Sequence, residues 1–159
     1  MDPNQLREHV ISPVLTALGL RSEAAELLVL GTACQESNLR YLKQLGKGPA
    51  WGIYQMEPNT HDDIWGNWLR YNSELAEKVL GFNIPGLYDG HDYKEMGGNL
   101  YYATAMCRIH YRRVKAPLPA ADDLPGMARY WKQYYNTPKG KGTTGEFISN
   151  FRKYSGVKL

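Results

Sequence analysis

The feature that most constrains this chain is an almost wholly apolar run, AAELLVLGTAC, over residues 24–34. Ser22 just before it is a good N-cap for a helix. A helix that is apolar on nearly every side has to be buried among other elements, because it has no face to turn toward water. The sequence therefore predicts a central buried helix over about residues 22–37, whose C-terminal end carries the polar sequence QES.

Helical periodicity recurs along the rest of the chain. It predicts further helices over about residues 3–18, 60–70, 73–80, 92–113 and 123–135. Thr143 and Glu146 form a capping-box pattern that predicts the start of a last helix, which contains Phe147, Ile148, Phe151 and Tyr154. A glycine-rich segment, residues 43–58, interrupts them and indicates a loop or a short β-hairpin around WGIYQME. The length and the absence of repeats or long linkers fit a single domain, and no apolar run approaches the roughly 20 residues that a membrane helix needs.

Charge is unevenly distributed along the chain. Residues 1–107 carry a net charge of −5, and residues 108–159 carry +8. A basic C-terminal third suits a polyanionic partner, such as nucleic acid, an anionic cell wall or a membrane surface, but also an ordinary solvated face. Part of it is a basic run formed by Arg108, Arg112, Arg113 and Lys115. Favourable charge at a helix C-terminus explains this run more simply than nucleic-acid binding, for which no motif is present.

Neither the cysteines nor the histidines indicate a metal or a cofactor. Cys34 and Cys107, the only cysteines, both lie in apolar helical patterns, which favours two buried thiols and leaves one disulfide open. The segments HDD (residues 61–63) and HD (residues 91–92) contain ligand types but no ligand spacing. We therefore expect no metal site and no cofactor.

Glu36 is the residue with the clearest chemical potential. A carboxyl group at the end of a buried helix, beside a glycine-rich aromatic loop, is partly desolvated, and a helix C-terminus disfavours negative charge. Both effects raise its pKa. A carboxylic acid that stays protonated near neutral pH can protonate the leaving oxygen of a glycosidic bond. The alternative interpretation is a surface glutamate just after the last helical turn.

Four short motifs resemble the soluble lytic transglycosylase and goose-type lysozyme family. They are Glu36-Ser37 at a helix end, the G-x-x-Q sequence within GIYQMEPNT (residues 52–60), Asn99-Leu100 at a helix start, and Tyr135-Asn136. Their order along residues 22–140 is more specific than any one dipeptide. Two departures stand out: Tyr54 replaces the usual methionine, and Thr137-Pro138 replaces the small residues that normally follow the asparagine.

The resemblance implies one lysozyme-like catalytic domain over residues 1–159, of the α+β class, mostly α-helical with a small β-hairpin. It implies cleavage of the β-1,4 bond between N-acetylmuramic acid and N-acetylglucosamine in peptidoglycan, with Glu36 as the general acid. Tyr135 is expected to orient the Glu36 carboxyl or a sugar, and Trp51 either stacks on a sugar or belongs to the core. The expected substrate-binding residues are Ser37, Trp51, Tyr54, Gln55, Tyr135 and Asn136.

A second carboxylate decides the reaction type. Lytic transglycosylases use one glutamate and close an anhydro ring, whereas hydrolases commonly use a second carboxylate to activate water. Glu57 follows Gln55 by two residues, and residues two apart in a strand share a face, so both would point into the cleft. A solvent-exposed Glu57 is the alternative. Asp62 and Asp63 are further candidates that fit better as acids in the first turn of a helix.

These observations favour a muramidase with Glu36 as acid and Glu57 as base. The alternatives are a lytic transglycosylase that uses Glu36 alone and a non-catalytic phage structural or binding protein on the same scaffold; a nucleic-acid-binding domain is a distant third. No signal peptide and no wall-binding module are visible, which suits a phage enzyme delivered to the bacterial cell wall by other machinery. We expect a monomer or a component of a phage assembly, without nucleic acid and without membrane insertion.

Overall fold

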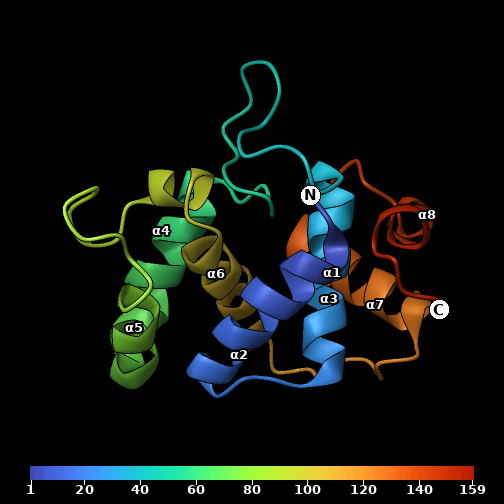
Figure 1. Ribbon diagram of the computed structural model, residues 1–159, viewed down its shortest axis with the longest axis horizontal. Helices are drawn as coiled ribbons and strands as arrows, with labels where there is room; N and C mark the ends of the chain where they lie inside the picture. The colour runs from blue at the N-terminus through green and yellow to red at the C-terminus, as the bar shows by residue number, and fades with distance from the viewer.

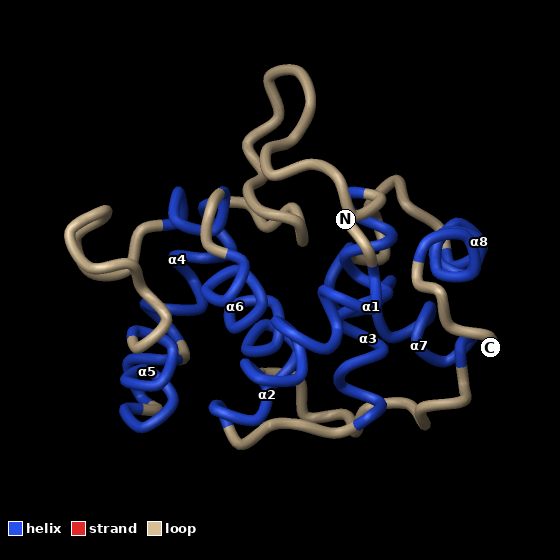
Figure 2. The backbone as a smooth tube through the Cα atoms, viewed as in Figure 1, coloured by secondary structure: helices blue, strands red, loops and turns tan.

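The computed structural model describes all residues from Met1 to Leu159 and is built from helices joined by loops (Figures 1 and 2). The α-helices are α1 (Pro3–Leu6), α2 (Ser12–Leu18), α3 (Glu23–Ser37), α4 (Pro58–Asn67), α5 (Ser73–Leu80), α6 (Leu100–Arg112), α7 (Leu124–Trp131) and α8 (Thr144–Tyr154). Shorter turns are the 3₁₀ segments Leu69–Tyr71 and Tyr93–Gly97 and the π-helical segments Arg7–Ile11 and Lys132–Asn136. Every helix falls short of the length and apolar character that a membrane crossing requires.

Helix α3 is the central element, as the apolar run predicts. Ser22 caps it, since its hydroxyl accepts a hydrogen bond from the Ala25 amide at 3.1 Å. The side chains from Ala25 to Cys34 are all buried, and the helix contacts α6, α7 and α8. It ends where Asn38 adopts a left-handed conformation, with φ of 51°. Burial on all sides therefore fixes where the C-terminal end of α3, with Glu36, meets the other helices.

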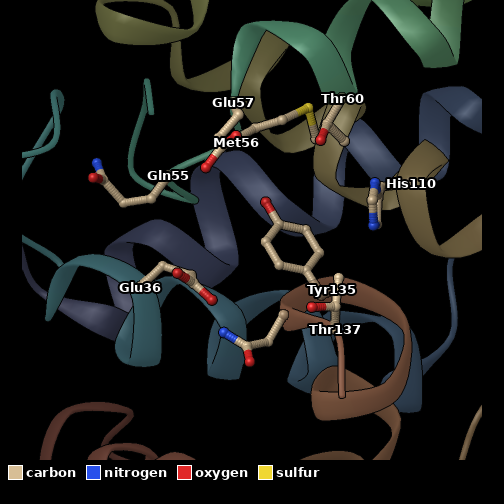
Figure 3. A pocket seen from close by; sticks show the side chains of 9 residues that line it. Glu36, Gln55, Met56, Glu57, Thr60, His110, Tyr135 and Thr137 are labelled. Carbon is tan, nitrogen blue, oxygen red and sulfur yellow. The ribbon is translucent and has the colours of Figure 1, made fainter. Parts of the chain in front are cut away.

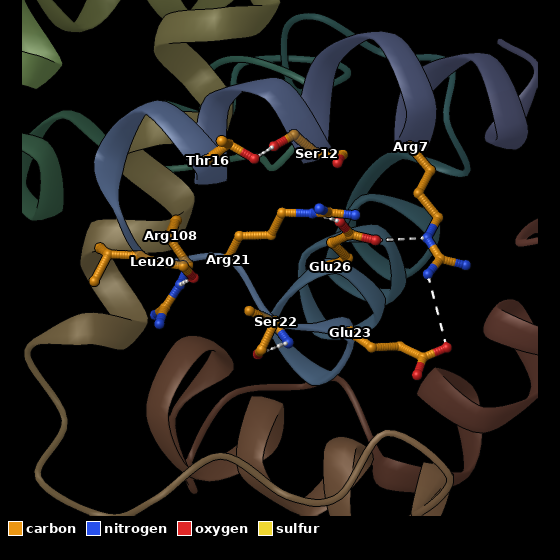
Figure 4. A network of polar contacts seen from close by, with 10 residues as sticks. Arg7, Ser12, Thr16, Leu20, Arg21, Ser22, Glu23, Glu26 and Arg108 are labelled. Carbon is orange, nitrogen blue, oxygen red and sulfur yellow. Dashed lines mark hydrogen bonds and ion pairs between the residues drawn. The ribbon is translucent and has the colours of Figure 1, made fainter.

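The one acid buried inside α3 is neutralised by two arginines from neighbouring segments. Arg7 Nε donates to Glu26 Oε2 at 3.0 Å, and Arg21 Nε donates to Oε1 at 2.7 Å (Figure 4). Burial raises the pKa of Glu26, but the hydrogen bonds from Arg21 and Arg7 outweigh that effect and leave it lowered. The ion pairs thus hold the N-terminal helical segment against the start of α3.

The conformation of the glycine-rich segment shows that the predicted fold class is wrong. The expected α+β fold with a β-hairpin is wrong, because residues 43–58 form no strand and only two isolated bridges, Lys43 with Trp51 and Trp51 with Met56. The amide of Trp51 donates to the Met56 carbonyl at 2.8 Å, and the reverse bond is 3.0 Å. Gly52 and Gln55 between them have φ of 74° and 48°, which no strand accommodates. The segment therefore closes as a tight turn directly before α4.

The expected helix over residues 92–113 is also divided. A 3₁₀ segment, Tyr93–Gly97, precedes Gly98, and α6 begins only after Asn99, whose side chain caps it by accepting from the Tyr102 amide at 3.1 Å. A Cβ on Gly97 would lie 3.0 Å from the Trp51 ring, so the glycine lets the turn before α4 approach closely. The helix predicted over residues 92–113 is therefore interrupted between Gly97 and Leu100, next to the contact of Gly97 with the Trp51 ring.

Other sequence predictions are confirmed. Thr143 and Glu146 form the expected capping box at the start of α8. Cys34 and Cys107 are both buried and free, so the disulfide that the sequence left open does not form. Burial raises the pKa of Cys34 to about 12. The apolar side chains of the helix predicted over residues 3–18 pack into the core. A π-helical segment, Arg7–Ile11, interrupts that helix directly before α2, which contains Pro13.

The contact between α3 and α8 yields a stability prediction. A Cβ on Gly31 would lie 2.6 Å from Phe147 Cζ and 3.0 Å from Phe151 Cδ2. Gly31→Ala should lower the free energy of unfolding by about 1–3 kcal/mol, measured by urea denaturation, although alanine is the better helix former by about 1 kcal/mol. Gly66→Ala is the matched control, since nothing lies within 4 Å of its Cβ position in α4. A Gly31→Ala variant as stable as this control would contradict the close approach.

Candidate active site

A polar pocket of about 320 Å³ lies where α3, α6, the turn before α4 and the segment after α7 meet (Figure 3). The residues that line it are Glu36, Gln55, Met56, Glu57, Thr60, His110, Tyr135, Asn136 and Thr137. Two thirds of the chain separate the first from the last of them. The pocket therefore exists only in the folded protein, and it brings together five of the eight site residues that the sequence predicts.

Glu36 enters the pocket from the last turn of α3 and is half-buried. Its Oε1 accepts a hydrogen bond of 2.8 Å from the indole Nε1 of Trp131. Burial raises the pKa of Glu36 to about 7, and the Trp131 hydrogen bond opposes part of that increase because it stabilises the carboxylate. A carboxyl with a pKa near neutrality, held in one orientation, can both give and take a proton at ordinary pH.

Trp131 gives the Glu36 carboxyl its fixed position. Its side chain is fully buried in α7 and packs against the ring of Phe147, with 5.4 Å between the ring centroids. The sequence analysis did not select it. A signal was present, because Trp131 precedes Tyr135 by four residues, a spacing that places both side chains on the same face of a helix.

Glu57 lies on the wall opposite Glu36 (Figure 3). It occupies the N-cap position of α4, is mostly exposed, and its side chain makes no capping hydrogen bond. The N-terminus of a helix stabilises negative charge, whereas its C-terminus, where Glu36 lies, disfavours it. The two carboxyl groups therefore face one pocket from opposite helix ends, Glu36 from the C-terminal end of α3 and Glu57 from the N-terminus of α4.

Gln55 lines the same pocket, but not by strand alternation as the sequence suggested. Its φ of 48° lies in the left-handed region. Its side-chain Nε2 donates to the carbonyl of Gly52 at 2.8 Å and to that of Tyr41 at 3.3 Å. These bonds fix the amide within the turn and leave its oxygen as an acceptor that a ligand can use.

Tyr135 lines the pocket without holding Glu36. Its hydroxyl donates to the backbone carbonyl of Tyr54 at 2.8 Å, and its ring lies against His110 with 4.8 Å between centroids. Trp131, and not Tyr135, holds the Glu36 carboxyl, so a contact with a sugar is the part of the expectation for Tyr135 that stays a prediction. Tyr135 thus fastens the segment after α7 to the turn before α4, across the pocket.

Asn136 also lines the pocket, beside Tyr135. Its Oδ1 accepts from Lys132 Nζ at 2.7 Å. The following residue, Thr137, has φ of 82°, so the chain turns sharply after the π-helical segment. This turn, where the sequence departs from the family pattern, closes one side of the pocket.

Three predicted site residues lie outside this pocket. Tyr54 is 1% exposed, and its hydroxyl pairs with the Thr104 hydroxyl at 2.8 Å in the core. Trp51 packs beside Tyr93, with 6.0 Å between the ring centroids. The hydroxyl of Ser37 turns back to the carbonyl of Ala33 within α3, at 3.1 Å. Tyr54 therefore belongs to the core, Trp51 packs half-buried against it, and the Ser37 hydroxyl is bound within its own helix.

A more open cavity of about 640 Å³ continues from the pocket along the loop after α3. It shares Glu36, Gln55, Glu57 and Asn136 with the pocket and adds Ser37 at its edge. The shared residues make the two cavities one groove. An extended ligand at the Glu36 carboxyl therefore has room along the loop after α3.

His110 also lines the pocket, although no sequence motif pointed to it. Its Nε2 donates to the Tyr134 carbonyl at 2.8 Å, and its Nδ1 accepts from Arg113 Nη2 at 3.3 Å. Burial lowers its pKa to about 4. The imidazole is therefore neutral at ordinary pH, so Glu36 is the titrating group of the pocket near neutrality.

No group of three or more His, Cys, Asp and Glu side chains is arranged to hold a metal ion. Comparison of the chain with protein-family models, with curated proteins and with solved structures gave no match. The functional interpretation therefore depends on the geometry of the pocket and on the motifs that it brings together.

The hydrogen bond from Trp131 makes a testable prediction about Glu36. In Trp131→Phe the carboxylate loses its only side-chain donor, so the pKa of Glu36 should rise above about 7. Carbon-13 NMR of the labelled glutamate side chains measures it directly. Trp51→Phe, which changes a tryptophan outside the pocket, should leave the titration of Glu36 where it is. A titration that is also unchanged in Trp131→Phe would refute the contact.

The raised pKa also predicts a pH-dependent stability. The pKa of Glu36 is about 7 in the folded protein against an ordinary value of 4.5, so the folded state binds its proton more tightly than the unfolded chain. This stabilisation is complete below about pH 4.5 and is lost as the pH rises through about 7. Glu36→Gln cannot ionise and should gain stability relative to the parent over that window. Urea unfolding of the parent and the variant at about pH 4.5 and about pH 8 measures this gain. If the two proteins differ in free energy of unfolding by the same amount at both pH values, the pKa of Glu36 is not raised.

Proposed function

We propose that the protein is a peptidoglycan glycosidase that cleaves the β-1,4 bond between N-acetylmuramic acid and N-acetylglucosamine. The observation that carries the proposal is the Glu36 carboxyl, with a pKa of about 7, held by Trp131 in a polar groove. The groove continues from this carboxyl along the loop after α3, which gives an extended glycan room. Three of the four family motifs have residues in this groove and supply the substrate class, whereas the fourth, Asn99-Leu100, caps α6.

In this proposal Glu36 protonates the glycosidic oxygen as the bond to it breaks. Burial keeps a large share of Glu36 in the acid form near neutral pH, and Trp131 stabilises the carboxylate left after proton transfer. Gln55 offers its amide oxygen to a sugar hydroxyl or N–H group, because its NH₂ group is already bound within the turn. These contributions do not depend on whether water or a sugar hydroxyl completes the reaction.

Glu57 completes a hydrolytic mechanism. Its carboxylate lies across the pocket at the N-terminus of α4, where negative charge is stabilised. It would take a proton from water as the water attacks the sugar carbon, and Glu36 would already have protonated the leaving group. A basic C-terminal third would hold the enzyme to an anionic wall.

The second candidate is a lytic transglycosylase that uses Glu36 alone. The observation that favours it is the exposure of Glu57, whose side chain makes no capping bond and is not held in one place. In that reaction a hydroxyl of the muramic acid attacks in place of water and leaves a 1,6-anhydro end. Mass spectrometry of the released muropeptides distinguishes the two, because hydrolysis leaves reducing ends.

Glu36→Gln should reduce cell-wall lysis by about 10²–10⁴-fold or more, because an amide cannot donate the proton. The fold should persist, since the glutamine oxygen can still accept from Trp131. Turbidity loss of purified peptidoglycan measures the rate. The matched control is Glu77→Gln, an exposed carboxylate in α5. Lysis at the parent rate by Glu36→Gln would disprove the proposed function.

Glu57→Gln tests the hydrolytic assignment. If Glu57 activates water, the variant should lose reducing-end products by about 10²-fold or more while it still binds glycan, because an amide cannot accept the proton. Muropeptide mass spectrometry and a glycan-binding assay measure the two effects. Unchanged rate and anhydro products in both parent and variant would assign the transglycosylase reaction instead.

A further inference from the structure

The structure divides the basic run at the C-terminal end of α6. Arg113 forms an ion pair with Asp63 of α4, with 2.7 Å between Nη1 and Oδ2. Arg108, Arg112 and Lys115 form no ion pair with any carboxylate of the chain. Three positive charges therefore remain without a counter-charge at one end of a helix.

These three cations share a cavity that the proposed function does not use. The cavity has a volume of about 240 Å³, and Arg108, Arg112 and Lys115 line it together with Tyr111 and Tyr130. No acidic side chain lines it. The Tyr130 hydroxyl donates to the carbonyl of Ala116 within the lining, and Val114, Pro117 and Leu118 add apolar surface. The cavity is thus positively charged on one side and apolar on another.

Arg108 is the strongest indication of a ligand. Its side chain is buried, with 7% exposed, yet its guanidinium makes a single hydrogen bond, from Nε to the Leu20 carbonyl at 3.3 Å. It points away from Glu26, whose two oxygens are occupied by Arg7 and Arg21 (Figure 4). Burial lowers the pKa of Arg108, and the charge of Arg112 lowers it further. The two Nη groups have no hydrogen-bond partner in the protein and reach solvent, so they are free to donate to a ligand anion.

We propose that this cavity binds a phosphate group. The planar guanidinium of Arg108 carries paired donors that match two phosphate oxygens, and Arg112 and Lys115 add two further charges. Three cations around one small cavity suit a doubly charged phosphate better than a singly charged carboxylate. Val114, Pro117 and Leu118 line the cavity beside the cations and give apolar surface for the organic part of a phosphate ester.

The phosphate site is separate from the catalytic pocket. Arg108 and Arg112 are four residues apart and share one face of α6, whereas His110 between them faces the pocket of Glu36. A bound phosphate therefore makes no contact with Glu36. Phosphate of the same chemistry is available as the free ion, in small esters and in the phosphate polymers of bacterial walls.

The first test measures binding of inorganic phosphate by calorimetry and by the shift in melting temperature, against chloride at equal ionic strength. The double variant Arg112→Gln, Lys115→Gln removes two exposed charges without touching the core and should weaken phosphate binding by about tenfold or more. Arg108→Lys keeps the charge and loses the paired donors, so it should also weaken binding. The exposed pair Lys153→Gln, Lys158→Gln changes the net charge equally and is the control.

Two results would overturn the proposal. One is phosphate binding no stronger than that of chloride; the other is equal weakening by the cavity variant and the control variant, which would indicate diffuse charge rather than a site. Turnover of small soluble glycan fragments should be unchanged in the cavity variant, so failure here is distinguishable from failure of the glycosidase proposal.

A second arm identifies the source of the phosphate. Co-sedimentation compares walls that retain their phosphate polymers with walls from which acid has removed them. Stronger retention on the phosphate-bearing walls, lost in the Arg112→Gln, Lys115→Gln variant, assigns the site to the polymer. Equal retention on both, with phosphate binding intact in solution, assigns it to free phosphate or small esters.

Discussion

Burial of α3 on all sides is the constraint on which the rest of the structure depends. An apolar helix without a polar face is stable only when other elements surround it, and α6, α7 and α8 do so here. Gly31 allows the rings of α8 to reach the backbone, and Glu26 is tolerated because two arginines neutralise it. The same packing places the last turn of α3, with Glu36, against the indole of Trp131.

The candidate site uses the two ends of helices in opposite ways. Glu36 lies at the C-terminal end of α3, where burial and the helix dipole both favour the protonated form. Glu57 lies at the N-terminus of α4 and is mostly exposed. One groove thus contains a potential acid and a potential base of the same residue type. Environment separates two carboxyl groups into two roles in this way in glycosidases generally.

Local sequence signals predicted the helices well and the loop poorly. A capping residue contacts only backbone groups within a few positions of itself, so helix ends follow directly from the sequence. Ser22 and Thr143 cap the starts of α3 and α8 in this way, and Gly19 ends α2. The turn before α4 does not, because a hairpin and a closed turn share the same alternation of apolar residues. Positive φ at Gly52 and Gln55 decided between them, and the packing of that turn against the 3₁₀ segment before α6 imposes those angles.

The sequence by itself determined that α3 is buried and that it ends in an acid. Those properties follow from an apolar run and from its position along one helix, which are local. Only the tertiary structure decided that Trp131 rather than Tyr135 holds Glu36, that Tyr54 belongs to the core, and that Arg108 remains unpaired beside two other cations. Each of these depends on contacts between residues far apart in the chain, since burial and charge pairing are set by whichever distant side chain occupies the neighbouring space.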